Sequence, residues 1–192
     1  MASRLLRKYA RPRLLPLYAA TVGLAAVAEP TPLGFALGGS LVVAGLALRA
    51  WGAGYLVKTQ RLAMEGPYAR VRHPLYVGSL LIGLGFGTLS GAAGLLGVLG
   101  LGLPFFLLYY VPYKERIESA RLERRFGAAY AAYRARVPAL LPRLPRGASS
   151  PGPSSAAGAW SLARLRHNHE LGTNAAVLAV LLGFAVRLAV GP

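Results

Sequence analysis

The sequence predicts an all-α integral membrane protein, a polytopic bundle of about five transmembrane helices. Three observations lead to this fold class. The chain of 192 residues is 55% hydrophobic, has a mean hydropathy of +0.46, and has only 15% charged residues, against about 25% in a typical soluble domain. It is nevertheless strongly basic, with a net charge of +16. The basic residues are separated from long apolar runs, a pattern typical of membrane helices joined by basic loops.

The composition excludes several other classes of protein. A disordered basic tail would contain few apolar residues. The chain has no cysteine, which excludes a disulfide-stabilised fold, a thiol nucleophile and a thiolate metal site. A nucleic-acid-binding domain would explain the charge but not the apolar excess, so we expect no nucleic acid among the partners.

The N-terminal third contains two predicted spans. Residues 1–13 form a basic arm with five Lys and Arg, and residues 14–57 hold transmembrane helices 1 and 2, separated by a Pro-rich turn. The first apolar run, Leu14–Ala28, is short and ends in Ala-Val-Ala, which is similar to a signal-peptide cleavage site. We expect the span to be retained, because the second apolar run, Leu33–Val57, follows at once as in a helical hairpin.

The middle of the chain contains a predicted helical hairpin. The 40 residues Pro74–Tyr113 include no acid or base, and as helix they would extend about 60 Å, enough for two crossings of a ~30 Å hydrocarbon core. Ser90-Gly91 lies near the midpoint and predicts the turn. Gly83 and Gly87 form a small-xxx-small pair, which predicts close packing within this hairpin.

The C-terminal part contains the fifth predicted span within residues 171–192. Residues 143–170 precede it, and their Pro, Gly and Ser content predicts a flexible cytosolic linker followed by an interface segment. His167 and His169 are two positions apart and do not share a helix face, so we expect no metal site there.

The charge distribution predicts the topology. Residues 1–13, 57–73 and 114–170 all carry an excess of Lys and Arg, and five spans place every one of these segments on the same side. The positive-inside rule makes that side cytoplasmic, including the N-terminus. We therefore expect a multi-pass protein of the cell membrane that meets anionic membrane lipids with its basic loops.

Two segments on the predicted cytoplasmic side concentrate chemically active residues. The first, Leu62–Gly78, has a Gly-Pro turn and then His73 directly before a proline, which favours the first turn of a helix. The second begins with Glu115 and Glu118, which are three positions apart and can face one site. Gly127 is a predicted helix C-cap, and a short amphipathic helix is expected from there to Pro138.

These segments resemble a known family. The residues Gly66-Pro-Tyr-x-x-x-Arg-His-Pro-x-Tyr-x-Gly78 are similar to the core motif of the isoprenylcysteine carboxyl methyltransferase / phospholipid methyltransferase family of integral membrane methyltransferases. The resemblance continues in Glu118-x-x-x-Leu-x-x-x-Phe-Gly-x-x-Tyr-x-x-Tyr133, then Val137-Pro and Leu141-Pro. Arg49-x-Trp51 is also similar, so the resemblance covers about residues 46–142.

The resemblance implies a methyltransferase that uses S-adenosylmethionine, with a core at residues 58–142. The cofactor site would lie on the cytosolic side under a C-terminal helical lid region, and a lipophilic or small-molecule acceptor would enter from the bilayer. The implied catalytic residues are Glu118 and Arg49. The implied cofactor-binding residues are Tyr68, Arg72, His73, Pro74, Tyr76, Gly78, Glu118 and Tyr130. Ser119 stands where the family has a second glutamate, and Glu115 is the alternative carboxylate.

The residue chemistry is compatible with this interpretation. Methyl transfer from a sulfonium requires alignment and exclusion of water rather than a covalent protein intermediate. Glu118 can hold the cofactor's ammonium or ribose hydroxyls, and Arg72 can pair with its carboxylate. His73 can donate to that carboxylate or act as a base, and tyrosines can face the sulfonium.

Several alternatives stay open at this point. Arg49 near the end of a span is also compatible with snorkelling, and Tyr130 and Tyr133 with an interfacial aromatic belt. The acceptor atom can be oxygen, nitrogen or sulfur. The alternative functions are an NADPH-dependent, sterol-reductase-like membrane enzyme and a non-catalytic membrane protein. The intact His-Pro-x-Tyr-x-Gly favours the methyl donor over NADPH.

Overall fold

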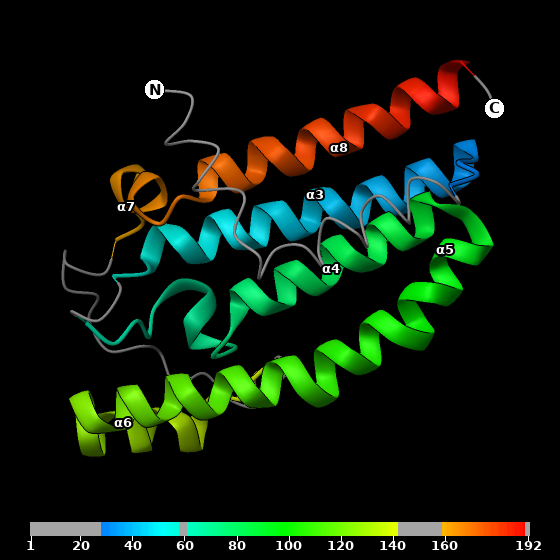
Figure 1. The fold of residues 1–192 in the computed structure, drawn as a ribbon. Coiled ribbons are helices and arrows are strands. Elements are labelled where there is room, and N and C mark those ends of the chain that lie inside the picture. The colour runs from blue at the N-terminus through cyan, green and yellow to red at the C-terminus, as the bar shows by residue number, and fades with distance from the viewer. Residues whose placement is uncertain (1–27, 58–60, 142–158, 191–192) are drawn as a thin grey trace, which may run out of the picture.

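The computed structural model describes residues 28–57, 61–141 and 159–190, and within these ranges the protein is helical and contains no strand. This confirms the predicted all-α class. Figure 1 shows the arrangement of the helices as a bundle. The helices are α3 (Pro32–Tyr55), α4 (Pro74–Leu89), α5 (Gly91–Gly97), α6 (Val111–Arg136), α7 (Leu162–His167) and α8 (Glu170–Val190), with a short 3-10 helix at Gly66–Ala69.

Three helical stretches are long and apolar enough to cross a membrane: Pro32–Tyr55, Gly91–Phe126 and Glu170–Val190. The fourth apolar helix, α4, is shorter at 16 residues. Four of the five predicted spans therefore correspond to apolar helices. The basic arm, the first predicted span with its cleavage-like sequence, and residues 143–158 of the predicted linker lie outside the described residues.

Helices α3 and α4 pack against each other through glycines spaced seven residues apart. A Cβ atom on Gly38 would lie 2.6 Å from the carbonyl oxygen of Gly85, and one on Gly45 would lie 2.6 Å from that of Gly78. The two backbones therefore touch, as small residues allow in membrane helices. The predicted role of Gly83 is wrong, because a Cβ there would meet nothing within 4 Å.

The turn between α4 and α5 lies at the predicted dipeptide. Gly91 has φ +80°, a left-handed conformation that favours glycine, and Ser90 is buried and accepts a hydrogen bond at its carbonyl from the Glu29 N–H. Gly87 does pack within this hairpin, since its Cβ position lies 2.9 Å from Val98 Cγ2. Nearby, the core joins α3, α4 and α8 through Val42, Leu89 and Phe184.

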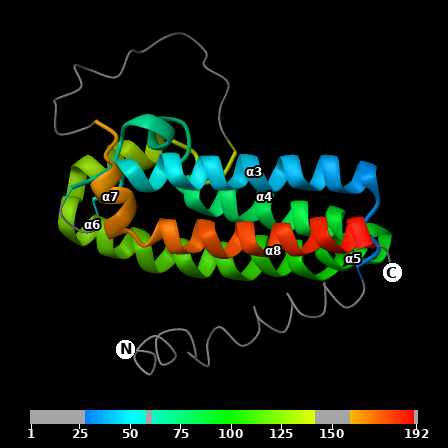
Figure 2. The ribbon, with the colours of Figure 1, turned by 90° about the horizontal axis from the view of Figure 1, so that it is seen from above.

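Helix α5 continues into α6 as one long rod, visible in Figures 1 and 2. Two π-helical segments, Val98–Gly102 and Phe105–Tyr110, flank Pro104, whose missing N–H breaks the regular hydrogen-bond ladder. Within α6, Gly127 has φ 49° and ψ −125°. The helix breaks there as the predicted C-cap requires, and the following turns fold back along the first part of α6 (Figure 1).

The segment before α8 is folded against the end of α3. The Trp160 indole N–H donates to the Ala50 carbonyl, and the Asn168 side-chain amide donates to the Ala53 and Leu56 carbonyls. These side chains therefore tie the segment before α8 to backbone carbonyls in the last turns of α3 and just after it. The end of the predicted linker is therefore an ordered structure containing α7, and α8 follows it alongside α3 (Figures 1 and 2).

Candidate functional site

Two segments far apart in the sequence are joined by hydrogen bonds at one end of the bundle. The backbone N–H of Arg72 donates to the Pro138 carbonyl at 2.8 Å, and that of His73 donates to the Ala139 carbonyl at 3.1 Å. The buried Tyr133 hydroxyl donates to the Tyr68 carbonyl at 2.8 Å. The loop before α4 and the end of α6 therefore form a single structural unit, which brings the two predicted motifs together.

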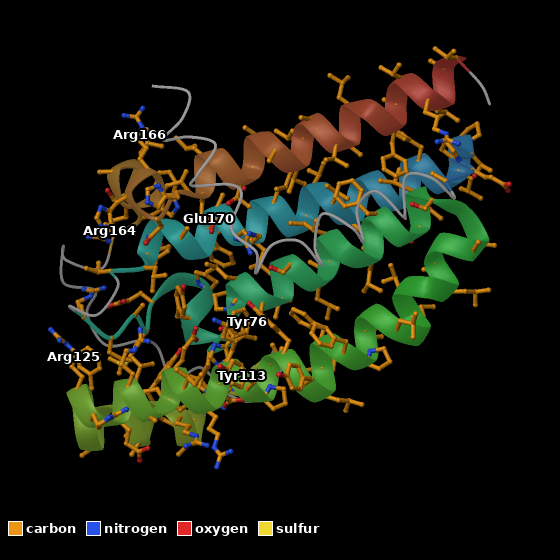
Figure 3. The ribbon with its side chains drawn as sticks, viewed as in Figure 1. Tyr76, Tyr113, Arg125, Arg164, Arg166 and Glu170 are labelled. Atoms are coloured by element: carbon orange, nitrogen blue, oxygen red, sulfur yellow. The ribbon has the colours of Figure 1, made fainter. Side chains whose placement is uncertain are left out.

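Glu118 lies at the centre of this unit. The Tyr76 hydroxyl donates to Glu118 Oε1 at 2.7 Å, and His73 Nδ1 lies 3.6 Å from Oε2. The His73 and Tyr76 rings stack with centroids 4.9 Å apart, while Tyr110 approaches Tyr76 edge-on at 5.9 Å. Figure 3 shows Tyr76 between α4 and α6. A carboxylate, an imidazole and two phenols thus face each other across these helices.

A second carboxylate pairs with Arg72 beside this centre. Arg72 Nη2 lies 2.6 Å from Glu115 Oε1, and the two side chains are 11% and 22% exposed. The remaining Arg72 nitrogens, Nε and Nη1, are buried and have no hydrogen-bond partner, and the same holds for His73 Nε2. Buried polar atoms without a partner are costly, so the two Arg72 donors indicate a place for a ligand's acceptor oxygens, and His73 Nε2 indicates a further polar contact.

Burial controls the protonation of the groups around the site. It lowers the pKa of His73, an effect that the Glu118 and Glu115 carboxylates oppose and Arg72 reinforces. The imidazole is therefore neutral near pH 7, with one nitrogen donating and the other accepting. Burial also raises the pKa of Tyr68, with smaller contributions in the same direction from Tyr133, Glu118 and Glu170. The Tyr68 phenol thus stays protonated.

Three other predicted cofactor-binding residues, Pro74, Gly78 and Tyr130, are all buried in the fold. Pro74 is fully buried as the first residue of α4. Gly78 faces α3, where a Cβ atom would lie 2.5 Å from Arg49 Cγ. Tyr130 is only 2% exposed, and its hydroxyl lies 2.6 Å from the Ser119 hydroxyl inside the fold of α6. Its burial excludes the aromatic-belt alternative, as the burial of Tyr133 does for that residue.

Arg49 is engaged by a partner that the sequence reasoning missed. Its Nη2 lies 2.7 Å from Oε1 of Glu170, and its Nε donates to Oε2 at 3.1 Å. Its Nη1 donates to the Ser79 hydroxyl at 2.7 Å and to the Leu75 carbonyl at 3.3 Å. These contacts hold the guanidinium between helices α3, α4 and α8, so they exclude the snorkelling alternative. The signal for Glu170 was its place as a single acid at the start of an apolar run, since ionisable residues in membranes tend to pair.

A hollow of about 340 Å³ adjoins the site within α6. Its lining includes Glu115, Ser119 and Glu123 before the kink and Arg134 after it. Among the residues that the structure describes, no group of three or more His, Asp or Glu could hold a metal ion. Figure 3 shows Arg125, Arg164 and Arg166 at the same end of the bundle as the site.

Three curated proteins are similar to parts of the chain, although no family model and no solved structure matches it. The cobalt-zinc-cadmium resistance protein CzcN of Cupriavidus metallidurans is 40% identical over 110 residues, 56% of this chain and 47% of that protein. The nickel-cobalt-cadmium resistance protein NccN of Alcaligenes xylosoxydans is 37% identical over 98 residues, 50% of this chain and 44% of that protein.

The third relative is an enzyme. The protein-S-isoprenylcysteine O-methyltransferase of Schizosaccharomyces pombe is 38% identical over 90 residues, 46% of this chain and 36% of that protein. The chain thus matches less than half the length of each of these relatives. The structure thus gives a helical protein with apolar helices long enough to cross a membrane, and the comparisons add a distant relative that is a methyltransferase.

Proposed function

We propose that the chain is an integral membrane methyltransferase that uses S-adenosylmethionine and methylates a lipophilic or small-molecule acceptor. The observation that carries this proposal is the site around Glu118, where Arg72 presents two buried, unpaired donor nitrogens and His73 one unpaired ring nitrogen beside two carboxylates. The sequence similarity to the isoprenylcysteine O-methyltransferase supports the same interpretation.

The residues of the site fit the charged groups of this cofactor. The unpaired Nε and Nη1 of Arg72 are cationic donors that can each donate to an oxygen of an anionic group such as a carboxylate, and the unpaired His73 Nε2 can hydrogen-bond a polar group of the ligand. The Glu118 carboxylate, held by the Tyr76 hydroxyl, can accept from an ammonium group or from ribose hydroxyls. The cofactor supplies a methyl group activated by a sulfonium.

The protein's own contribution is binding, orientation and exclusion of water. The stacked rings of His73 and Tyr76 provide an aromatic surface next to a carboxylate, an environment that favours a cation. Because Tyr133 and the 138–139 backbone hold the loop before α4 in place, the donors are preorganised, which lowers the cost of alignment. Ser119 is neutral and bonded to Tyr130, so the site's carboxylates are Glu115 and Glu118.

The orientation in the membrane is part of the proposal. The site lies at the end of the bundle that carries Arg125, Arg164 and Arg166 (Figure 3). Basic residues next to spans favour the cytoplasmic side. We therefore assign the site and the N-terminus to the cytoplasm and the protein to the cell membrane, with its basic end against anionic lipids.

A labelled-methyl transfer assay tests this function. Purified protein in lipid nanodiscs would receive S-adenosylmethionine carrying a labelled methyl group, together with prenylcysteine analogues, phospholipids, amines or thiols. We expect labelled product with one acceptor class and its loss in Glu118→Gln. Titration calorimetry with each cofactor distinguishes the alternatives: binding of NADPH but not of S-adenosylmethionine would contradict the proposed methyltransferase and favour the sterol-reductase-like alternative. Binding of neither cofactor would favour the non-catalytic alternative.

A further inference from the structure

The turn between α7 and α8 leads directly into a buried acidic side chain, Glu170. His169 has φ 62°, the left-handed conformation that His adopts more readily than most residues. Immediately before it, the buried Asn168 is bonded to the carbonyls of Ala53 and Leu56 at the end of α3. Glu170 follows as the first residue of α8 and is only 5% exposed. Figure 3 shows Glu170 beside α3.

The carboxylate of Glu170 fixes the guanidinium of Arg49 from one side. Both of its oxygens accept from Arg49, at 2.7 Å for Oε1 and at 3.0 and 3.1 Å for Oε2. The two side chains are 6% and 16% exposed. A two-pronged pair of this kind constrains the orientation of the guanidinium as well as its position.

The other side of the same guanidinium holds the first turns of α4. Arg49 Nη1 donates to the Leu75 carbonyl and the Ser79 hydroxyl, and Ser79 donates to the same carbonyl at 3.0 Å. Gly78 leaves the space that the Arg49 side chain fills. Leu75 adjoins Tyr76, whose hydroxyl meets Glu118, so one helical turn links the ion pair to the candidate site.

We infer that Glu170 is a positioning residue: through Arg49 it sets the first turn of α4, and with it the placement of His73 and Tyr76 toward Glu118. The inference rests on the proposed methyl transfer for its effect on rate. The structural link that it describes, from α8 through Arg49 to α4, does not depend on which reaction the site performs. It also assigns Arg49 a role through α4 in place of the contact with reacting groups that the sequence suggested.

The test compares Glu170→Gln, Glu170→Asp and the double variant Arg49→Gln/Glu170→Gln with the wild type. At a temperature where melting curves show all proteins folded, we expect Glu170→Gln to lower kcat by about 10- to 100-fold, the scale of an alignment error of about 1 Å. Asp restores part of the rate because it keeps the charge. The double variant is no slower than the single one, because both residues act through one link.

Hydrogen exchange measures the link without any catalysis. In Glu170→Gln we expect faster amide exchange at residues 74–79, while the glycine interface near Gly38 and Gly45 keeps its protection. Leu171→Ala is the control, since Leu171 is 45% exposed and lies in the same turn of α8 as Glu170. A folded Glu170→Gln protein with wild-type kcat and unchanged exchange at residues 74–79 would overturn the inference.

The two proposals fail in different ways. A wild-type protein that transfers no methyl group and binds no S-adenosylmethionine contradicts the proposed function, whereas the exchange experiment still decides the link. Faster exchange throughout α3, α4 and α8 in Glu170→Gln would show that the ion pair stabilises the whole bundle. That result would also overturn the positioning role.

Discussion

The Tyr76 hydroxyl donates to Glu118 while the Tyr76 ring stacks on His73. Removing the hydroxyl oxygen alone therefore separates the hydrogen bond from the ring stacking. Tyr76→Phe keeps the ring and removes the hydrogen bond. A hydrogen bond to a charged group contributes about 1.5–3 kcal/mol, so we expect S-adenosylmethionine to bind about 10- to 100-fold more weakly. Titration calorimetry measures this change.

Tyr113→Phe is the matched control for that substitution. It also removes one phenol hydroxyl, but from a ring that is 52% exposed and stacks on Tyr109. Its affinity for the cofactor should equal that of the wild type. Equal affinities for Tyr76→Phe and the wild type would show that Glu118 does not need this donor.

His73 makes the folded protein sensitive to acid. Burial holds its pKa below the ordinary value of 6.5, so the unfolded chain binds the proton first as the pH falls. Stability is therefore fully present above about pH 6.5 and decreases below it, down to the lowered pKa of the folded state. Between pH 7.5 and 5.5 we expect a larger fall in melting temperature for the wild type than for His73→Gln. Identical pH profiles would contradict this explanation.

At the scale of the helices, the contact between α3 and α4 depends on glycine positions rather than on glycine content. Gly85→Ala would bring a methyl group to 2.6 Å from the Gly38 carbonyl oxygen, whereas Gly83→Ala meets nothing within 4 Å. Overpacking typically costs about 1–3 kcal/mol. We expect a clearly lower melting temperature for Gly85→Ala and no decrease for Gly83→Ala. The reverse order would mean that α3 packs on a different face of α4.

Local sequence signals predicted the turn and the helix break, whereas contacts between distant parts of the chain could not be predicted from the sequence. The turn at Ser90-Gly91 and the break at Gly127 follow from backbone preferences that the sequence displays directly. The facing glycines were missed because pairing between helices depends on which faces meet. A small-xxx-small pattern within α4 cannot show whether Gly83 or Gly85 is the one that faces α3.

The same limit applies to the site. The resemblance grouped Arg72, His73, Tyr76 and Glu118, and the structure brings these four together. The partner of Arg49 was missed because Glu170 is 121 positions away in the sequence. Its approach requires the docking of Asn168 on α3 and the turn at His169, which no local pattern predicts.

For the whole molecule, the decisive property is the asymmetry between its two ends. The site, the fold-back of α6 and α7 lie at one end, and the apolar turn at Ser90-Gly91 lies at the other (Figures 1 and 2). Arginines labelled in Figure 3 gather at the end that holds the site. In a bilayer these two ends would face opposite compartments, and the proposed orientation, which follows the positive-inside rule, has the basic end in the cytoplasm.

Single cysteines can report this topology directly, because the natural chain has none. Ala92→Cys places an exposed thiol near the α4–α5 turn, and Arg125→Cys and Arg166→Cys place exposed thiols at the basic end. In intact cells we expect a membrane-impermeant maleimide to label Ala92→Cys only.

After permeabilisation all three variants should react, which controls for the accessibility of their thiols. Labelling of Arg125→Cys and Arg166→Cys in intact cells would place the candidate site outside the cytoplasm and would contradict the proposed orientation. If all three variants reacted in intact cells, the hairpin would not cross the membrane.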